Sequence, residues 1–431
     1  MYRNMITTLA DWSEQEQKEI LLLKGARGVG KTWCVMDFAE AFFKKAIHID
    51  FSKDTVLREM FLMGNRPEFI DEQLELLTET DLHAEDTSGI LMVYDGVQVA
   101  EDLFAGVMQY ARQRRNLATI IIADWVGVLP AENLVAEEIS VHTMYPMSFD
   151  EFLMANKAQE LCRMIEKEKT DGLAQDLRPI ILDYLKNFYI IGGMPAVVLD
   201  FIKQKNMNTV DEIQHHILHE MRDEILKYAP KTMVRKILQV WDSIPKQLTK
   251  ENKKFMYGVV DAKARAREYV GAVDWLVNAG YVRKVQKISK GVSPLEEYVE
   301  PKSFELYYLD HGLLRNISGI TAAEADADQQ IFSMMNGIMS EQIVLSELTL
   351  NQNVNELYFW TSEATAKVDF VFEDDGEIIP VDVQTNIRTK AQNLKVFHQK
   401  YNNRMTIRIS LESLSFYKGK LNIPLYGLWN F

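Results

Sequence analysis

Short apolar runs alternate with amphipathic stretches along the first 150 residues of the chain. The apolar runs predict four strands, at 20–24, 46–51, 89–94 and 118–123. Helices are predicted between them, at 32–45 and within the acidic stretch 55–87. Strands that alternate with helices form a parallel sheet that is covered on both faces, so this part of the chain is predicted to be an α/β domain over 1–150.

The pattern changes after residue 150. It is helical over 151–230, with a break at Gly192, Gly193 and Pro195. Three small helices followed by two strands are predicted over 231–320, which is the order of a winged helix. A mixed α/β segment is predicted over 330–431. We therefore expect a helical lid, a winged-helix module and a C-terminal α/β domain after the first domain.

Composition narrows the class of protein. The 431 residues are 47% apolar and 26% charged, which is typical of globular domains. No apolar run is long enough to predict a membrane span, and the first 17 residues lack the apolar core of a secretion signal. The only cysteines, Cys34 and Cys162, exclude a disulfide framework and a four-cysteine zinc site. A cytoplasmic protein without a membrane partner is expected.

A glycine-rich loop carries the strongest chemical signal. Residues 25–32, GARGVGKT, fit the pattern GxxxxGK[ST] in full. The residues of the loop expected to contact a nucleotide are Gly25, Arg27, Gly28, Gly30, Lys31 and Thr32. Glycines let backbone N–H groups turn toward phosphate oxygens, Lys31 reaches the β and γ phosphates, and Thr32 offers its hydroxyl to Mg²⁺. The alternative is a glycine turn without a ligand.

Two carboxylates at strand ends are the candidate catalytic residues. Asp95 ends the apolar run 90–94, where an Asp holds Mg²⁺ through water in many P-loop proteins. The next residue is Gly96, where many ATPases have a glutamate that activates water. Asp124, at the end of the fourth strand, is a candidate substitute base, and the alternative is an ordinary solvated Asp. Binding of ATP is therefore a firmer expectation than fast hydrolysis.

Several motifs together resemble a known family. They are GARGVGKT, the strand before Asp95, YPMSFDEFL (145–153), GGMP (192–195), SIPKQLTKENKKF (243–255) and the C-terminal VDFVF…IIPVDVQ. This set is similar to the bacterial and archaeal AAA-type ATPases, STAND-related, that carry a DUF4143 region. The resemblance implies an ATPase core that uses ATP and Mg²⁺, a winged helix, and a C-terminal domain like the PD-(D/E)xK nucleases. It also implies that Gly193 and Pro195, in a GxP motif, lie near adenine, although a simple helix break also explains them.

The chain departs from that family at two positions. The family usually has Asp-Glu where this chain has Asp95-Gly96, and Thr-Gly-Ser-Ser after the fourth strand where this chain has Ala-Asp-Trp-Val over 123–126. Both departures predict weak sensing of the γ phosphate and slow turnover.

The C-terminal hairpin predicts a pair of facing carboxylates. Two β-rich runs flank Asp375-Gly376, a strong type I′ turn signal, so paired positions sum to 751. Asp369 then faces Asp382, and two carboxylates at that distance repel unless a cation joins them. A divalent metal is the functional interpretation. By the same arithmetic, Lys367 faces Gln384.

The resemblance extends this pair to a nuclease-like site. It implies that Asp369 and Asp382 are two metal-binding acids, that Glu341 is the helical acid, and that Gln384 stands where the nuclease lysine belongs. A lysine that migrated to another position and a nuclease fold retained only for binding or packing both remain open.

Residues 231–290 form a basic segment in an acidic protein. They hold 14 Lys or Arg and 5 Asp or Glu, whereas the whole chain has a net charge of −14. The candidate residues are Lys246, Lys250, Lys253, Lys254, Lys263, Arg265, Arg267, Arg283, Lys284 and Lys287. They indicate binding to a nucleic-acid backbone, or a face that docks on acidic parts of the same chain.

The combined expectation is an ATP-binding, AAA-type P-loop protein that acts as a slow ATPase or nucleotide-dependent switch at DNA. Its partners are ATP and ADP, with DNA held by 231–290. One alternative is a metal-dependent nuclease regulated by ATP, and another is an interaction protein in which the nucleotide is structural. The oligomeric state is not predicted.

Overall fold

The structure is a computed structural model of the 431-residue chain. It describes every residue except 16–17, 65, 85, 101, 125–137, 175, 251, 352, 364 and 386–391, and the side chains of 170 and 171. The chain divides into two compact units. The N-terminal unit comprises residues 2–145 and 278–280, and the C-terminal unit comprises residue 1, 146–277 and 281–431. In the described part of the chain, every helix is too short or too polar to cross a membrane.

The N-terminal unit is built on a five-stranded parallel sheet with the order β2-β3-β4-β1-β5. Its strands are β1 (Ile20–Gly25), β2 (Lys45–Asp50), β3 (Ile90–Asp95), β4 (Ala118–Asp124) and β5 (Ile139–Met144). The four strands predicted from apolar runs are confirmed. The strand β5 was not predicted, because its sequence ISVHTM mixes polar and apolar positions and most of it is only half-buried.

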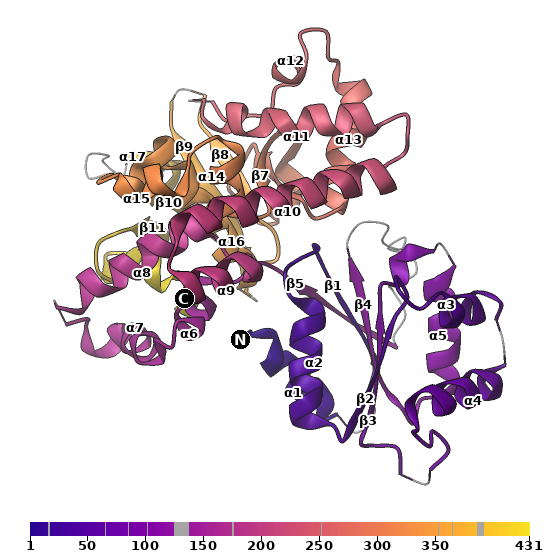
Figure 1. The fold of residues 1–431 in the computed structure, drawn as a ribbon. Coiled ribbons are helices and arrows are strands. Elements are labelled where there is room, and N and C mark those ends of the chain that lie inside the picture. Colours follow the sequence, from indigo (N-terminus) through magenta and orange to yellow (C-terminus); the bar gives the residue numbers. More distant parts are fainter. Residues whose placement is uncertain are drawn as a thin grey trace. The chain divides into compact units, whose positions relative to one another are not determined.

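Helices cover both faces of this sheet, as Figure 1 shows. They are α1 (Met5–Ser13), α2 (Lys31–Phe42), α3 (Thr55–Leu62), α4 (Pro67–Thr78), the short 3₁₀ helix η1 (Val97–Val99) and α5 (Leu103–Gln113). α1 and α2 lie on one side, and α3, α4 and α5 lie on the other. An aromatic cluster fills the second side, where Phe61 packs against the rings of Phe51, Tyr94 and Tyr110. Because β3 is buried on both faces of the sheet, its sequence is a continuous apolar run.

The C-terminal unit begins with helices. They are α6 (Phe149–Ala155), α7 (Gln159–Asp171), α8 (Leu177–Ile191), α9 (Pro195–Gln204), α10 (Met207–Tyr228), α11 (Val234–Leu248), α12 (Tyr257–Val260) and α13 (Ala266–Asn278). Later helical segments are η3 (Leu295–Tyr298), α14 (His311–Ile317), α15 (Ala322–Ala327), η4 (Ile331–Gly337), α16 (Ile338–Leu350), α17 (Gln392–Tyr401) and η5 (Leu425–Asn430). The helical character predicted for 151–230 is confirmed.

An eight-stranded mixed sheet organises the rest of the C-terminal unit. Its strands are β6 (Val282–Ile288), β7 (Val299–Tyr308), β8 (Tyr358–Thr361), β9 (Lys367–Asp374), β10 (Glu377–Gln384), β11 (Thr406–Ser410), β12 (Ser415–Tyr417) and β13 (Lys420–Pro424). The spatial order is β12-β13-β11-β10-β9-β8-β6-β7. The hairpin β6–β7 follows α11, α12 and α13 in the predicted winged-helix order, and it joins the larger sheet because β6 pairs in parallel with β8.

The predicted turn between β9 and β10 is present. Asp375 and Gly376 both have positive φ, 52° and 79°, as a type I′ turn requires. The ladder pairs Glu377 with Asp374 and continues to Val381 opposite Phe370, so the predicted register is confirmed over this range.

Candidate nucleotide site and buried carboxylate cluster

The parallel sheet of the N-terminal unit brings the predicted nucleotide-site residues to one edge. β1 ends at Gly25, β3 at Asp95 and β4 at Asp124, and all run in the same direction. Gly25 pairs with Asp124 in the register of β1 and β4. Because carboxyl ends of parallel strands meet at one edge, side chains that are far apart in sequence come together beside the glycine loop.

The loop between β1 and α2 has the backbone that its glycines predict. Gly28 and Gly30 have φ of 81° and 93°, a region that other residues rarely adopt. A Cβ on Gly25 would lie 2.3 Å from the carbonyl oxygen of Met144, so this position also excludes a side chain. The N-terminus of α2 opens directly onto the loop, where backbone N–H groups and the helix dipole favour a phosphate.

Lys31 is buried at this edge, and its ammonium group contacts three acceptor oxygens. Its Nζ donates to the carbonyl oxygens of Gly25 and Ala26, at 3.1 and 2.9 Å, and forms an ion pair of 2.7 Å with Asp124. The other carboxylate oxygen of Asp124 accepts a hydrogen bond of 3.0 Å from Gln98 Nε2. Both oxygens of Asp124 are therefore engaged, which suits a residue that positions Lys31 better than one that activates water.

The two predicted Mg²⁺ ligands are in direct contact. Thr32 Oγ1 donates a hydrogen bond of 2.6 Å to Asp95 Oδ2, and His48 Nε2 lies 3.5 Å from the same oxygen. A hydroxyl and a carboxylate are the hard oxygen donors that Mg²⁺ prefers, so these residues fit the ion. When bound, Mg²⁺ would neutralise negative charge on the phosphates beside Lys31.

Gly96 adopts a backbone that few side chains tolerate. Its φ is 77°, and its N–H donates to the carbonyl oxygen of Ile122 at 3.2 Å. A Cβ built on it would meet no atom closer than 3.6 Å, so the position has space but carries backbone strain for any other residue.

A carboxylate that sequence reasoning missed lies beside this position. Asp50 ends β2 opposite Asp95, and its Oδ1 would be 3.9 Å from a Cβ at Gly96. Burial acts to raise the pKa of Asp50, but Lys53, 2.7 Å away, and Ser52 hold it below its ordinary value. The available signal was a lone Asp at the end of the apolar run 46–51, the same signal that identified Asp95.

The predicted GxP residues lie in the C-terminal unit and have packing roles there. Gly192 has a φ of 80°, and the N–H of Gly193 donates to Asp310 Oδ2 at 2.7 Å. The Gly193 carbonyl accepts from the N–H of Met147 at 2.7 Å, and a Cβ on Gly193 would lie 2.3 Å from the Met147 carbonyl oxygen. Pro195 is the first residue of α9, a favoured place for proline. Their contact with adenine stays a prediction.

The C-terminal unit gathers the predicted nuclease-like acids into a buried cluster. Asp369 and Asp382 hydrogen bond to each other, and Asp369 Oδ2 also accepts from the N–H of Val383 at 3.1 Å. The predicted neighbours are therefore in contact, although the recorded ladder ends one pair earlier. Asp382 accepts a hydrogen bond from Gln384 and a longer one, 3.5 Å, from Asn393.

The ladder of β9 and β10 ends before Lys367 and Gln384, so their pairing stays a prediction. The ammonium of Lys367 forms an ion pair of 2.7 Å with Glu305 of β7 and lies 3.8 Å from Asp369, while Gln384 contacts Asp382. In the order of the sheet, β8 and β6 lie between β9 and β7. The turn arithmetic predicted the backbone register where the ladder is formed, but it did not predict these side-chain partners.

Two further residues complete the cluster around Glu341 of α16. Lys253 forms an ion pair with Glu341 Oε1, and Tyr307 donates to Glu341 Oε2 at 3.2 Å. Lys253 comes from the basic segment 231–290, and its contact with Glu341 fits the alternative in which this segment docks on acidic parts of the same chain. No local motif links it to the acids, because the contact joins positions 88 residues apart.

Burial and the added lysines set the protonation of the cluster. Burial raises the pKa of Asp369 to about 8, and the charge of Glu341 acts in the same direction. Burial also raises the pKa of Asp382. Burial acts to raise the pKa of Glu341 too, but Lys253 and Lys367 outweigh it and lower that pKa. Among the described residues, no group of three His, Cys, Asp or Glu side chains is arranged to hold a metal ion.

The basic segment 231–290 divides into two sets. Its strand residues are engaged within the unit: Arg283 donates to the Leu345 carbonyl and to Thr349 Oγ1, and Lys287 pairs with Glu300 at 3.0 Å. Most of the cations exposed to solvent lie on or beside α11 and α13, and Lys290, after β6, is also exposed. Those on or beside the two helices are Lys231, Arg235, Lys246, Lys250, Lys263, Arg265 and Arg267.

The fold and the loop geometry of the N-terminal unit define a P-loop nucleotide-binding domain, and family models agree. Residues 17–153 match the model described as an AAA domain (AAA_14), and residues 336–428 match a domain of unknown function (DUF4143). A further domain of unknown function (DUF8612) matches residues 182–324. The resemblance drawn from the motifs is confirmed by these matches, which place an AAA domain at residues 17–153 and a DUF4143 region at 336–428.

Solved structures with similar folds include a Walker-type ATPase of Pyrococcus abyssi, with 13% identity and a TM-score of 0.45 over 73% of this chain and 95% of that chain. The ORC1 protein of Aeropyrum pernix in complex with DNA has 14% identity and a TM-score of 0.30, covering 74% of this chain and 90% of that chain. The Drosophila ORC bound to DNA has 15% identity and a TM-score of 0.29, covering 70% and 90%. No curated protein matched the sequence.

Proposed function

We propose that this protein binds Mg²⁺ and ATP at the glycine loop, hydrolyses ATP slowly, and uses the nucleotide state to switch its affinity for DNA. The observation that carries the proposal is the edge of the parallel sheet, where Lys31, Thr32 and Asp95 have the chemistry of a phosphate and Mg²⁺ site while Gly96 lacks a base. Because the site binds ATP but hydrolyses it slowly, the ATP-bound and ADP-bound states each persist long enough to act as a signal.

The residual base for hydrolysis is proposed to be Asp50 rather than Asp124. Asp124 has both carboxylate oxygens engaged, by Lys31 and Gln98. Asp50 lies next to the place where a glutamate at position 96 would begin. Its Oδ1 accepts from Ser52, but the lysine on its Oδ2 is Lys53, which is 84% exposed and free to leave, whereas Lys31 on Asp124 is buried. Asp50→Asn is expected to reduce turnover more than Asp124→Asn, whereas Asp124→Asn should change the affinity for ATP by freeing Lys31.

The DNA surface is proposed to consist of the exposed cations on α11 and α13. Arg265 and Arg267 stand at the start of α13, the helix that follows the short α12 and precedes the β6–β7 hairpin. In helix-turn-helix proteins the corresponding region of the second helix enters the major groove. The engaged cations Arg283 and Lys287 serve packing, so both alternatives drawn from the basic segment apply, each to different residues.

The test of the switch is a DNA titration in two nucleotide states. The labelled duplex is titrated with the protein in Mg²⁺ and a slowly hydrolysed ATP analogue, and again in Mg²⁺ and ADP. A difference in Kd of about tenfold, a coupling of about 1.4 kcal/mol, is expected. Equal affinities in both states, with ATP bound, would favour the alternative in which the nucleotide is structural.

A metal-dependent nuclease is the second candidate, and one observation favours it. Lys253 and Lys367 bring two ammonium groups to Glu341 and Asp369, although the motif lysine is replaced by Gln384. A migrated lysine of this kind could stabilise the charge that develops during phosphodiester cleavage. Cleavage of plasmid DNA in Mn²⁺, lost in both Lys253→Ala and Asp382→Ala, is the result that would select this candidate.

A further inference from the structure

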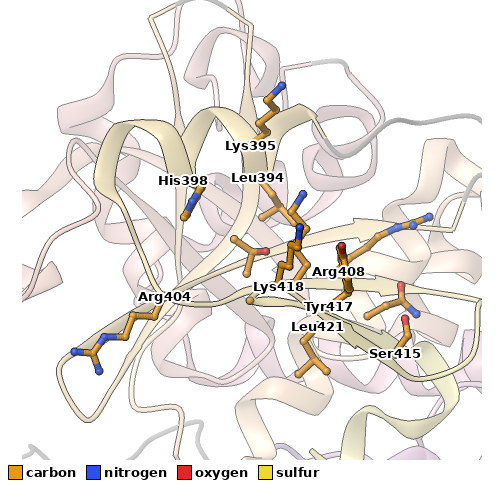
Figure 2. A pocket seen from close by; sticks show the side chains of 13 residues that line it. Leu394, Lys395, His398, Arg404, Arg408, Ser415, Tyr417, Lys418 and Leu421 are labelled. Atoms are coloured by element: carbon orange, nitrogen blue, oxygen red, sulfur yellow. The ribbon is translucent and has the colours of Figure 1, made fainter.

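A cationic pocket lies at the edge of the eight-stranded sheet that β12, β13 and β11 form. It has a volume of about 270 Å³ and lies between α17 and the strands β11, β12 and β13. Its lining residues are Leu394, Lys395, His398, Arg404, Thr406, Arg408, Ser415, Tyr417, Lys418, Gly419, Lys420, Leu421 and Asn422. Figure 2 shows Lys418 and Tyr417 close together near Leu394 of α17, while Leu421 and Arg404 extend away from them.

The register of the three strands explains why polar groups gather on one face. β11 pairs in parallel with β13, and β13 pairs antiparallel with β12. Residues that are paired across strands share a face, so two cross-strand rows result. They are Thr406, Lys420 and Tyr417 in one row and Arg408, Asn422 and Ser415 in the other. The opposite face carries buried apolar residues, Ile407, Ile409 and Ile423.

The lining is strongly positive. It includes five Lys or Arg side chains and His398 but no Asp or Glu. Arg404 and Arg408 have partners in Glu377, at 2.9 Å, and Glu412, at 3.4 Å. In the described part of the chain, no ion pair is recorded for Lys395, Lys418 or Lys420. The last forty residues, 392–431, hold six Lys or Arg and one Asp or Glu in a protein of net charge −14.

An apolar and aromatic part stands beside the charges. Leu394 contributes aliphatic groups. Tyr417 is 68% exposed, and Lys418 Nζ lies 5.2 Å from the centre of its ring. His398 Nδ1 donates to the carbonyl oxygen of Asn403 at 3.0 Å, which orients the ring and leaves Nε2 as its other polar atom. Cations next to an aromatic ring are the combination that binds a nucleotide unit, through the phosphate and the face of the base.

We propose that this pocket binds one nucleotide unit, with the phosphate on Lys418 and Lys420 and the base against Tyr417. The volume approaches the lower end of known ligand pockets, about 300 Å³, and so limits the occupant to a small unit or the end of a strand. The unit comes either from a free nucleoside monophosphate or from single-stranded nucleic acid, since both present the same phosphate and base. This site is separate from the glycine loop and independent of the proposed switch.

The first test uses the full chain with Lys31→Ala, so that the glycine loop does not contribute nucleotide binding. A short fluorescein-labelled oligothymidylate is titrated by fluorescence anisotropy, with and without Lys418→Glu and Lys420→Glu together. The matched control carries Lys302→Glu and Lys400→Glu, which change the net charge equally at exposed lysines outside the pocket. The pocket variant is expected to lose at least about tenfold in affinity, and the control less than about twofold.

A competition experiment then distinguishes the two sources. If AMP displaces the labelled strand, a free nucleotide is a sufficient ligand. If AMP does not compete, the ligand is single-stranded nucleic acid. Both outcomes agree with the proposed pocket. Tyr417→Ala, in the same background, is expected to weaken binding about threefold to tenfold through lost stacking. Equal affinity of the pocket variant and the charge-matched control would overturn the proposal. So would binding of a phosphoserine peptide at this pocket without binding of either nucleotide probe.

Discussion

The nucleotide site and the carboxylate cluster both gather acids from β-strands, yet the surroundings of these acids differ. The side chains of Asp95 and Asp124 are 20% and 22% exposed. Each lies within hydrogen-bonding distance of another polar side chain, Thr32 for Asp95 and Lys31 for Asp124. Asp369 and Asp382 are 8% and 3% exposed and contact each other. The second pair is buried away from solvent, and burial raises the pKa of Asp369 to about 8.

The difference shows that the residue type of an acid does not by itself determine its surroundings in the folded protein. In the N-terminal unit, an open edge leaves the oxygens of Asp95 partly exposed beside the hydroxyl of Thr32. In the C-terminal unit, the acids contact Lys253 and Lys367 and accept hydrogen bonds from Tyr307 and Gln384. Equivalent residue types on β-strands therefore have open surroundings in one unit and buried, lysine-containing surroundings in the other.

The largest expected effect is loss of ATP binding in Lys31→Ala. The substitution removes charge-assisted hydrogen bonds to the phosphates, each of about 1.5–3 kcal/mol, so the affinity should fall by about a hundredfold or more. Isothermal calorimetry with Mg²⁺ and ATP measures it. Lys45→Ala, at an exposed lysine of β2, is the control and should bind as the wild type does. Equal affinities of the two variants for ATP would show that the glycine loop is not the ATP site.

The next effect concerns turnover at Gly96. Gly96→Glu supplies a base beside Asp95, and general bases contribute about 10²–10⁴-fold, so we expect turnover to rise at least tenfold. The positive φ should cost about 1–2 kcal/mol of stability. Gly96→Ala carries the same strain without the carboxylate and separates the two effects. If Gly96→Ala and Gly96→Glu hydrolyse ATP equally, the missing base is not the cause of slow turnover.

A smaller effect is expected at the proposed DNA surface. Arg265→Ala and Arg267→Ala together should reduce the salt dependence of duplex binding by about 1.8 in log–log slope, because two phosphate contacts are lost. The matched pair, Lys284→Ala and Lys287→Ala, removes cations that already contact Asp274 and Glu300. That pair should change the slope much less. Fluorescence anisotropy over a range of salt concentrations measures both slopes. A larger change in the Lys284 and Lys287 variant would mean that DNA contacts the cations of the strands rather than those of α13.

The last prediction concerns the burial of the carboxylate cluster. The pKa of Asp369 in the folded protein, about 8, lies above its ordinary value of 3.8. The folded state therefore binds more protons between these values, and stability should fall as pH rises from about 4 to about 8. Asp369→Asn should flatten this part of the profile of Tm against pH.

The control for this profile is Asp375→Asn, in the exposed turn of the same hairpin, which should leave the pH dependence unchanged. A wild-type protein whose stability rises across this range, with the rise lost in Asp369→Asn, would mean that Asp369 is ionised and stabilised by its neighbours. Such a result would make the cluster resemble the nucleotide site.

Local sequence signals predicted much of the fold. The strand ends at Gly25, Asp95 and Asp124, the glycine loop, and the turn at Asp375-Gly376 follow from short-range rules of backbone geometry, and the structure has them. The helices around 32–45 and 265–280 were also predicted, because their apolar periodicity is strong. β5 was missed because its side chains are only half-buried and its pattern is weak.

Contacts between distant segments were beyond the reach of these rules. Lys253 joins Glu341, and Lys367 joins Glu305, through the packing of α16 and β7 against the hairpin. Asp50 became a candidate only when β2 was paired with β3. The cationic pocket arises from three short strands whose individual sequences show no motif. In each case the chemistry depends on which strands are neighbours, and no local pattern specifies that.

The central claim is that the glycine loop binds ATP competently while the absence of a base at Gly96 keeps hydrolysis slow. Steady-state turnover of the wild-type protein, with saturating Mg²⁺ and ATP and a measured Kd on the same preparation, tests it most directly. The account predicts clear ATP binding together with a turnover far below the common enzyme value of about 10 s⁻¹. A rate at or above that value, lost in Lys31→Ala, would contradict it.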